Sequence, residues 1–218
     1  MIPLSYRLEC ALQYTKGFHT LRDVGCDHAY FPIKAVLLGY VSKAIASDNK
    51  QKPYENARTN VAINHLEKQI DVILKDGLDG IKEDEDVVSI LGMGGHVISE
   101  ILENSDLSHV KRLILGPNSD QHIVRSFLQE NHYAIVDEEF IKDQGKFYQI
   151  IIAEVGKMKL TPNELKFGPI NIQKQSDALI EFVHKMLVKL ELAKIKSQQK
   201  ETTMKLASQI LMLKDVLK

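Results

Sequence analysis

Short apolar runs alternate along the first 156 residues with stretches whose apolar positions recur at helical spacing. Each apolar run ends at acidic residues, asparagine or glycine, where a strand is expected to stop. The runs predict strands at 20–25, 43–47, 71–75, 86–91 and 111–115. The stretches around them predict helices at 5–16, 32–38, 52–64, 96–104 and 120–131. This alternation predicts a parallel sheet with helices on both faces.

Two further apolar runs, at 133–141 and 147–155, follow the last of these helices and flank a turn at 143–146. A connection this short joins antiparallel strands, and such a pair commonly closes an otherwise parallel sheet. The expected fold is therefore α/β, with a seven-stranded mixed sheet. The order of its elements resembles that of the Rossmann-like class I methyltransferases.

The chain changes character after residue 156. Residues 157–173 carry Pro162, Gly168 and Pro169, and we interpret them as a linker. Beyond the linker, apolar residues recur in alternating steps of four and three, which is coiled-coil spacing. These positions are Leu179, Val183, Met186, Leu190, Ala193, Leu206, Ile210, Leu213 and Leu217.

A polar stretch at 197–203 interrupts the coiled-coil spacing. We therefore expect two helices folded into an antiparallel hairpin, the longer about 25 residues and about 38 Å in length. The expected domains are 1–156, which carries the sheet, and 157–218, which carries the linker and the coiled-coil hairpin. We expect a monomer, although the same spacing also fits helices paired between two chains.

Charge is divided unevenly between these two parts. Residues 1–156 carry a net charge of −7, and residues 157–218 carry 12 lysines against 6 acidic residues, a net charge of +6. A polyanion would be attracted to the second part and repelled by much of the first. The alternative interpretation is that the lysines only solubilise an exposed pair of helices.

Several classes of protein are disfavoured by the sequence. We expect no membrane partner, because no apolar run is long enough to span a bilayer. Two cysteines, Cys10 and Cys26, make a disulfide framework improbable and favour a reducing, cytoplasmic location. The eight histidines are scattered without metal-ligand spacing, so we expect no metal site.

Candidate chemistry gathers where the predicted strands end. The sequence Asp-Val-Gly-Cys-Asp-His-Ala-Tyr at 23–30 follows the first strand and opens a helix. Open α/β sheets bind nucleotide-like ligands at this edge. The turn contains one glycine, Gly25, whereas the dinucleotide fingerprint G-x-G-x-x-G needs three. A dehydrogenase is therefore the least favoured enzyme class.

Acidic residues follow the second and third strands. Asp48, with Asn49 beside it, lies about 20 residues beyond the glycine turn, where a carboxylate can accept both hydroxyls of a ribose. Its alternative role is that of a helix N-cap. Asp76, Gly77 and Leu78 suit an adenine, with a carboxylate for the exocyclic amine and a backbone N–H for a ring nitrogen. The alternative is a glycine turn that simply ends the strand.

The fourth strand ends in Gly-Met-Gly-Gly at 92–95. Glycines let the backbone approach a ligand closely, although this run could also be a turn packed under the next helix. His28, between Asp27 and Tyr30, is a candidate for orienting a substrate, or else a polar group satisfied locally. Cys26 is interpreted as a small buried residue and not as a nucleophile.

With these residues in view, nearly the whole chain resembles the bacterial tRNA (adenine-22-N1)-methyltransferases. Residues 23–30 are similar to the family signature D-[IV]-G-[ST]-D-H-A-Y, with Cys26 in place of Ser or Thr. The segment at 92–95 stands where many nucleic-acid amino-methyltransferases carry an N-P-P-F type motif. Gly116, Pro117 and Asn118 resemble the family's Q-P-N, and Gly116 replaces its glutamine.

The resemblance implies S-adenosylmethionine as methyl donor and tRNA as acceptor. It implies that Asp23 and Gly25 face the methionine part of the donor, that Asp48 and Asn49 hold the ribose, and that residues 76–78 hold the adenine. The implied donor site comprises Asp23, Gly25, Asp48, Asn49, Asp76, Gly77, Leu78, Gly92, Met93 and Gly94.

Adenine N1 carries an in-ring lone pair, so methyl transfer to it needs alignment more than a strong base. A carboxylate near the base would stabilise the positive charge that develops there, and Asp27 is the first candidate. His28, Tyr30 and Asn118 are the candidate positioning groups. The hairpin lysines Lys185, Lys189, Lys194 and Lys196 would bind tRNA phosphates.

Two other functions stay open from the residues alone. One is a methyltransferase whose acceptor is a small molecule or a protein, which keeps the donor site. The other is a non-catalytic RNA-binding protein that retains the fold. The basic hairpin argues weakly against the first, and the complete set of motifs at the strand ends argues against the second.

Overall fold

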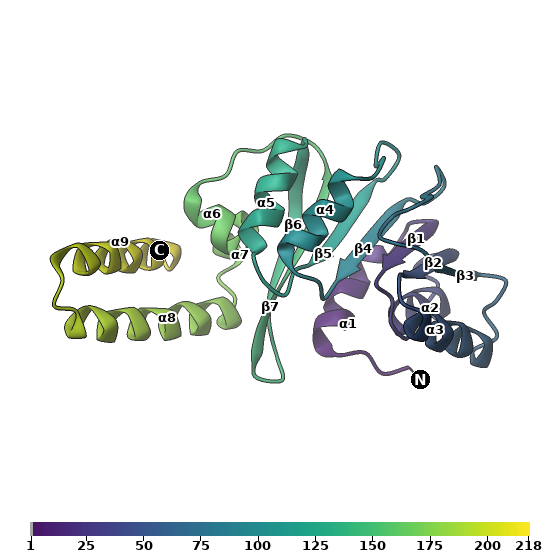
Figure 1. Ribbon diagram of the computed structural model, residues 1–218, viewed down its shortest axis with the longest axis horizontal. Coiled ribbons are helices and arrows are strands. Elements are labelled where there is room, and N and C mark those ends of the chain that lie inside the picture. The colour runs from purple at the N-terminus through teal and green to yellow at the C-terminus, as the bar shows by residue number, and fades with distance from the viewer. Residues whose placement is uncertain (1) are drawn as a thin grey trace.

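The computed structural model describes residues 2–218 and contains one seven-stranded sheet of order β3-β2-β1-β4-β5-β7-β6 (Figure 1). All neighbouring pairs are parallel except those that involve β7, which runs antiparallel to both β5 and β6. The strands are β1 (Thr20–Val24), β2 (Lys43–Asp48), β3 (Ile70–Leu74), β4 (Val87–Leu91), β5 (Arg112–Gly116), β6 (Tyr133–Asp143) and β7 (Lys146–Val155). The predicted mixed sheet and its closing antiparallel pair are confirmed.

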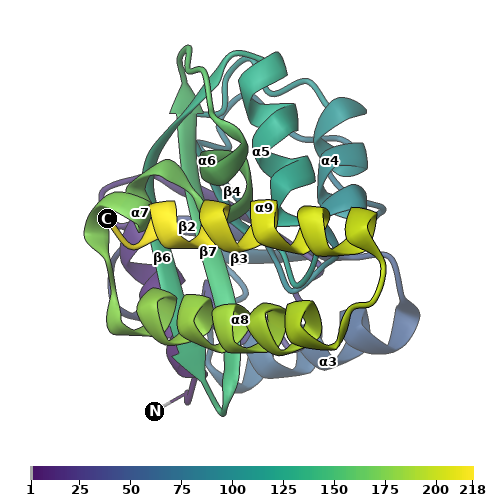
Figure 2. The same ribbon diagram turned by 90° about the vertical axis from the view of Figure 1, so that its left-hand side faces the viewer.

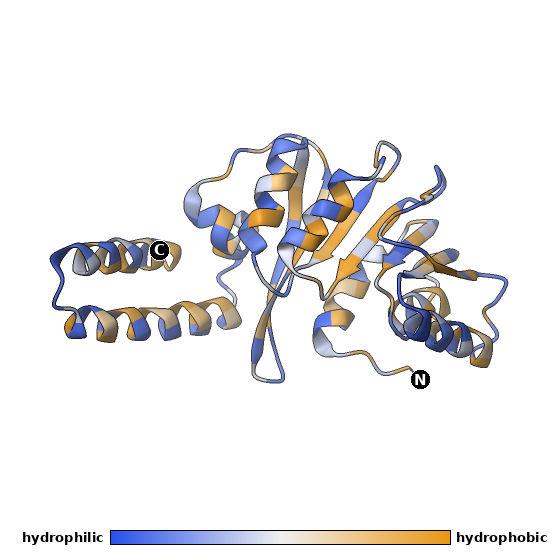
Figure 3. Ribbon diagram, viewed as in Figure 1, coloured by the Kyte–Doolittle hydropathy of each residue, from blue (hydrophilic) through white to orange (hydrophobic). Residues whose placement is uncertain are grey.

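Strands β4 and β5 are buried on both faces, which explains why they appear in the sequence as nearly continuous apolar runs. Along β5, Leu113 and Leu115 belong to one core and Ile114 to the other, as the twofold alternation of a strand requires. One core contains α1, α2 and α3, and the other contains α4 and α5. In Figure 3, β4 and β5 are largely orange, the colour of hydrophobic residues.

The helices of the sheet domain agree with the predicted ranges to within a few residues. Residues 13–15 end the first predicted helix as a single 3-10 turn. The helices are α1 (Tyr6–Leu12), α2 (Tyr30–Leu37), α3 (Gln51–Ile63), α4 (Gly95–Glu103) and α5 (Gln121–Glu130). Because the strand order reverses between β1 and β4, the loops after these two strands diverge and leave a crevice at their carboxyl ends.

The segment that we interpreted as a linker, residues 157–173, contains two short helices. The segment folds into α6 (Pro162–Phe167) and α7 (Pro169–Lys174), separated by Gly168. A capping box starts α6, in which Thr161 Oγ1 accepts from the backbone N–H of Glu164 and the Glu164 carboxylate accepts from that of Thr161. Each helix begins with a proline in its first turn, where the missing N–H costs nothing.

The predicted C-terminal hairpin is confirmed, with α8 (Asp177–Lys196) and α9 (Lys200–Val216) lying side by side (Figure 2). The prediction for the longer helix was too long, because α8 has 20 residues, or about 30 Å. The pair projects beyond the β6–β7 edge of the sheet, at the left of Figure 1. At its base, Phe182 of α8 packs on Phe140 and Phe147, with ring centroids 5.4 and 5.2 Å away.

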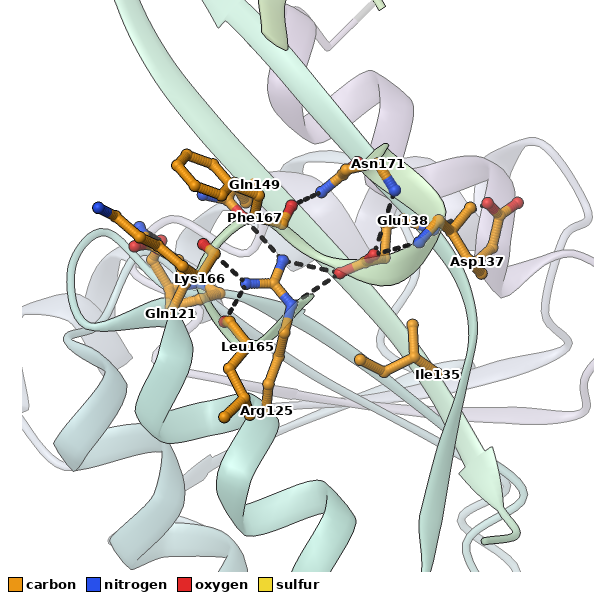
Figure 4. Close-up of polar contacts among 12 residues, drawn as sticks. Gln121, Arg125, Ile135, Asp137, Glu138, Gln149, Leu165, Lys166, Phe167 and Asn171 are labelled. Carbon is orange, nitrogen blue, oxygen red and sulfur yellow. Dashed lines mark hydrogen bonds and ion pairs between the residues drawn. The ribbon is translucent and has the colours of Figure 1, made fainter. Parts of the chain in front are cut away.

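A buried ion pair lies where the sheet meets the C-terminal helices (Figure 4). Arg125 of α5 and Glu138 of β6 are fully buried, and Glu138 Oε1 accepts from Arg125 Nε (2.9 Å) and Nη2 (2.7 Å). Arg125 also donates to Gln149 Oε1 and to the carbonyls of Leu165 and Lys166 at the end of α6.

The start of α7 is fixed by the same carboxylate. Glu138 Oε2 accepts from the backbone N–H groups of Ile170 and Asn171. Gly168 has a φ of +91°, and a Cβ there would collide with the Glu138 carboxylate. Nearby, Lys174 Nζ donates to the carbonyl of Glu138 (2.6 Å) and Ser176 Oγ to that of Phe140 (3.3 Å).

Candidate functional site

Two cavities meet at the carboxyl edge of the sheet. The large cavity, of about 570 Å³, lies above the ends of β1, β2, β3 and β4. The small cavity, of about 350 Å³, lies between the β1–α2 turn and residues 3–8. Both cavities are lined by Gly25, Asp27, Leu91 and Gly92, so these four residues form the boundary between them.

Most of the residues that we assigned to donor binding come together around the large cavity. Asp23 lines the small cavity instead, and Gly94 lines neither cavity. Asp27 lines both. The assigned residues that line the large cavity are Gly25, Asp48, Asn49, Asp76, Gly77, Leu78, Gly92 and Met93.

The turn after β1 is held in an unusual conformation. Gly25, Asp27 and Ala29 have φ values of +71°, +48° and +55°, in the left-handed region. Such a conformation costs a non-glycine residue about 1–3 kcal/mol, so the surrounding structure must fix it. The backbone N–H groups of Gly25 and Cys26 both donate to the carbonyl of Ser47, which ties the turn to β2.

Hydrogen bonds also join the loops after β1, β2 and β3. Asp48 Oδ2 accepts from the backbone N–H of Asp27 (3.3 Å), and Asp48 Oδ1 accepts from that of Lys50 (3.0 Å). Asp48 is therefore not the N-cap of α3, a position that Lys50 occupies. Asn49 Nδ2 donates to Asp76 Oδ1 (2.9 Å). Two of the carboxylates that line the large cavity, those of Asp48 and Asp76, are thus oriented by their neighbours.

Asp23 is a buried carboxyl group directly beneath this turn. Burial raises the pKa of Asp23 to about 7, the nearby Asp48 charge adds to the rise, and the hydrogen bond from Ser89 Oγ (2.6 Å) opposes it. Burial likewise raises the pKa of the Cys26 thiol, so the thiolate is not formed near neutral pH. A positive charge in the adjoining cavity would favour the ionised form of Asp23.

The glycine run after β4 divides into two parts. Gly92 has a φ of +92° and lines both cavities, so no side chain separates them there. Gly94 and Gly95 instead pack on residues 119–120, and a Cβ on Gly95 would collide with the Asp120 backbone. Of the two interpretations of residues 92–95, the packed turn therefore applies to Gly94 and Gly95, and the close approach to a ligand to Gly92.

The small cavity is lined by His28 and Tyr30, whose rings are stacked with centroids 5.3 Å apart. His28 Nε2 lies 3.6 Å from Asp27 Oδ2, and the Asp27 side chain is 67% exposed. Asn118 lines neither cavity, but its amide donates to the carbonyl of Gly92 (2.6 Å) at their boundary. A flat ring entering here would meet aromatic and carboxylate groups.

Sequence reasoning missed two walls of the site. One face of α4 completes the large cavity, and its positions follow the helical repeat that could have revealed them. They are Val97, Glu100 and Ile101, followed by Asn104 and Ser105 just beyond the end of the helix. Residues 3–8 form the outer wall of the small cavity. No local motif marks them, because they reach the site only through the packing of α1.

The four hairpin lysines assigned to tRNA are all exposed on α8. Lys185 Nζ pairs with Glu181 (2.8 Å), a carboxylate that also pairs with Lys142 (2.7 Å). Lys189, Lys194 and Lys196 form no ion pair with any residue in the described part of the chain.

Across residues 2–218, no helix is long and apolar enough to cross a membrane. The same residues contain no group of three or more His, Cys, Asp or Glu side chains that could hold a metal ion.

The comparisons with known proteins agree on one family. Residues 21–215 match the family model described as tRNA (adenine(22)-N(1))-methyltransferase. The chain is similar to the protein of that name from Bacillus subtilis (strain 168), with 38% identity over 158 residues, which cover 71% of this chain and 66% of that protein.

Solved structures cover nearly the whole chain. A Streptococcus pneumoniae protein in complex with S-adenosyl-L-methionine is 36% identical, with a TM-score of 0.91 and coverage of 99% of this chain and 100% of that one. An M. capricolum relative in complex with S-adenosyl-homocysteine is 27% identical, with a TM-score of 0.87 and 99% coverage of both chains.

Proposed function

This chain belongs to the tRNA (adenine(22)-N(1))-methyltransferase family, and we propose that its two cavities hold the two substrates of that reaction. S-adenosylmethionine occupies the large cavity, the target adenine enters the small cavity, and the methyl group passes to N1 at the boundary between them. The observation that carries the proposal is the shared lining of Gly25, Asp27, Leu91 and Gly92.

The residues of the large cavity fit S-adenosylmethionine. Asp48, at the end of β2, accepts the ribose hydroxyls, with Asn49 beside it. Asp76 and the backbone at Leu78 bind the adenine ring of the donor. The buried Asp23, which lines the small cavity, lies on the side of the boundary toward which the positively charged methionine end of the ligand points. S-adenosylmethionine supplies an electrophilic methyl group on a sulfonium.

The residues of the small cavity hold and align the target base. Adenine N1 is already nucleophilic at neutral pH, so no residue has to act as a strong base. Asp27 stabilises the positive charge that the base gains as it is methylated. His28 and Tyr30 position the ring, and Asn118 holds Gly92 in place. N1 lies on the Watson–Crick edge, so the nucleotide must leave its stack to reach the cavity.

The α8–α9 hairpin carries the phosphate-binding surface for the body of the tRNA. We propose that Lys189, Lys194 and Lys196 contact phosphates, with Lys185 beside them, because exposed unpaired lysines that bind a polyanion displace the cations condensed around its phosphates. We also propose that the chain works as a monomer, since α8 finds its partner helix within the same chain. A tRNA substrate supports a cytoplasmic location.

The proposed reaction is tested with two tRNA transcripts that differ only in having adenine or guanine at position 22. Transfer of labelled methyl to the adenine transcript alone is expected. Label on both transcripts would move the target to another nucleotide. Label on neither, with the donor still bound, would favour a small-molecule or protein acceptor. A chain that does not bind the donor would favour the non-catalytic RNA-binding protein.

The hairpin surface is tested by replacing Lys189, Lys194 and Lys196 with Gln. Loss of three phosphate contacts should weaken tRNA binding and reduce the slope of log affinity against log salt by about 2–3. Donor affinity should not change. The matched control replaces three lysines in or just after α9 that have acidic partners, and it removes the same charge. They are Lys205, Lys214 and Lys218. Equal losses in both variants would contradict a specific surface on α8.

A further inference from the structure

Arg7 lies in the outer wall of the small cavity, in the first turn of α1. Its guanidinium carbon is 4.9 Å from the centre of the Tyr148 ring, which belongs to β7. The guanidinium also lies against the boundary of the two cavities. A Cβ built on Gly92 would be 3.7 Å from Arg7 Nη2 and 4.0 Å from Asn118 Nδ2. Arg7 is thus a half-buried cation beside the proposed point of methyl transfer.

This cation is not neutralised by the protein. The backbone N–H of Arg7 donates to Asp143, but within residues 2–218 its guanidinium forms no ion pair and no hydrogen bond. Three other arginines are each paired with a glutamate, namely Arg22, Arg112 and Arg125. An arginine held on an aromatic ring, with its donors unused and facing a cavity, is set to bind an anion.

The chemistry of the proposed reaction indicates which anion. The target adenine becomes positively charged as N1 is methylated, and an uncompensated guanidinium beside it would oppose that change. A flipped nucleotide brings its own flanking phosphates to the mouth of the cavity. A guanidinium binds phosphate through two parallel hydrogen bonds, which fix position as well as charge.

We propose that Arg7 binds a backbone phosphate next to the target adenine and so fixes the flipped nucleotide at the small cavity. Tyr148 holds the plane of the guanidinium for this contact. Arg7 is a positioning residue in this role. The proposal rests on the proposed function, since it assumes that the small cavity receives a nucleotide.

The test pairs Arg7→Ala with tRNAs that carry one uncharged methylphosphonate linkage on the 5′ or the 3′ side of adenine 22. For the unaltered protein, one of these linkages should lower kcat/KM by about 10-fold to 100-fold, the loss of one charge-assisted contact. Arg7→Ala should lower kcat/KM on ordinary tRNA by a similar factor. The kcat/KM of Arg7→Ala should then differ by less than about 2-fold between ordinary tRNA and the methylphosphonate tRNA, because the contact is already absent.

Two controls separate this contact from a structural role. Donor affinity of Arg7→Ala should be unchanged, because Arg7 does not line the large cavity. Arg7→Lys keeps the charge without the planar group, so it should retain part of the activity and stay sensitive to the uncharged linkage. Arg58→Ala is the matched variant, since Arg58 lies over the Tyr54 ring and lines neither cavity. It should behave like the unaltered protein.

Several outcomes would overturn the proposal. If the neutral linkages lower kcat/KM by the same factor in Arg7→Ala and in the unaltered protein, the phosphate and Arg7 act independently. Full activity of Arg7→Ala on ordinary tRNA would exclude the contact directly. An unaltered protein that methylates nothing at adenine 22 would refute the proposed function and the contact with it.

Discussion

Replacing Glu138 by Gln tests how strongly the sheet is joined to the C-terminal helices. The carboxylate accepts four hydrogen bonds. Oε1 accepts two from Arg125, and Oε2 accepts two from the backbone N–H groups of Ile170 and Asn171. A glutamine has one acceptor oxygen and one donor amide. Whichever way the amide turns, its NH2 group faces two other donors, and Arg125 keeps a buried charge without a counter-ion.

The size of the effect follows from these contacts. Two of the four bonds are lost, at about 1.5–3 kcal/mol for each bond that involves a charged group. Removing one member of a buried ion pair costs about 3–5 kcal/mol in comparable cases. We therefore expect the free energy of unfolding to fall by about 3–5 kcal/mol, and the melting temperature by about 6–20 °C for a domain of this size.

The assay is urea unfolding followed by circular dichroism, because the chain contains no tryptophan to serve as a fluorescent probe. Arg125→Met combined with Glu138→Gln should be less destabilised than Glu138→Gln alone, since no unpaired charge then remains buried. Donor affinity measured below the unfolding transition should be unchanged, because neither residue lines a cavity. A loss below about 1 kcal/mol in the single variant would refute this account of the ion pair.

Three further predictions concern the cavities. Asp48→Asn should weaken S-adenosylmethionine binding by about 10-fold to 100-fold in calorimetry, as expected for one charge-assisted hydrogen bond, and unchanged affinity would exclude the ribose contact. The pKa of Asp23 is raised to about 7, so between about pH 3.9 and 7 the folded protein keeps a proton that the unfolded chain releases. Stability to urea should therefore fall as pH rises through that interval, and Asp23→Asn should flatten the dependence; an equal slope in both proteins would contradict the assigned pKa. Gly92→Ala places a side chain at a φ of +92° between the cavities. Turnover at saturating donor should fall by more than 10-fold, which is about the effect of a small misalignment of the reacting atoms. A fully active variant would show that the boundary tolerates a methyl group.

Most of the fold could be predicted from the sequence because local pattern and tertiary role agree there. Most strands of the sheet are rich in apolar residues and bounded by turn residues, and each long helix repeats its apolar positions. The short helices α6 and α7 were missed because six residues are too few for a periodic pattern. Their stability comes from tertiary contacts, since Phe167 and Asn171 are buried and Arg125 and Glu138 bind their backbones.

The site shows the same division between local and long-range information. Residues at the strand ends could be brought together from sequence, because parallel strands place their carboxyl ends at one edge. Arg7 could not be found in this way. It reaches Tyr148 and Gly92 only because α1 packs beside β7, and no local signal reports a contact between residues so distant in the chain. The cavity wall formed by α4 was predictable in part, because its cavity-lining residues share one face of the helix and so follow the helical repeat.

The hydrogen bonds that Lys174 and Ser176 donate to the carbonyls of Glu138 and Phe140 have a consequence for aggregation. Strand β6 is an outermost strand of the sheet, and its 11 residues are enough to template pairing with another polypeptide. The C-terminal segment covers this edge with side chains that occupy its carbonyl groups. A fragment that ends at residue 156 would lack this cover, so we expect it to self-associate through β6 even though every residue of both cavities is present in it.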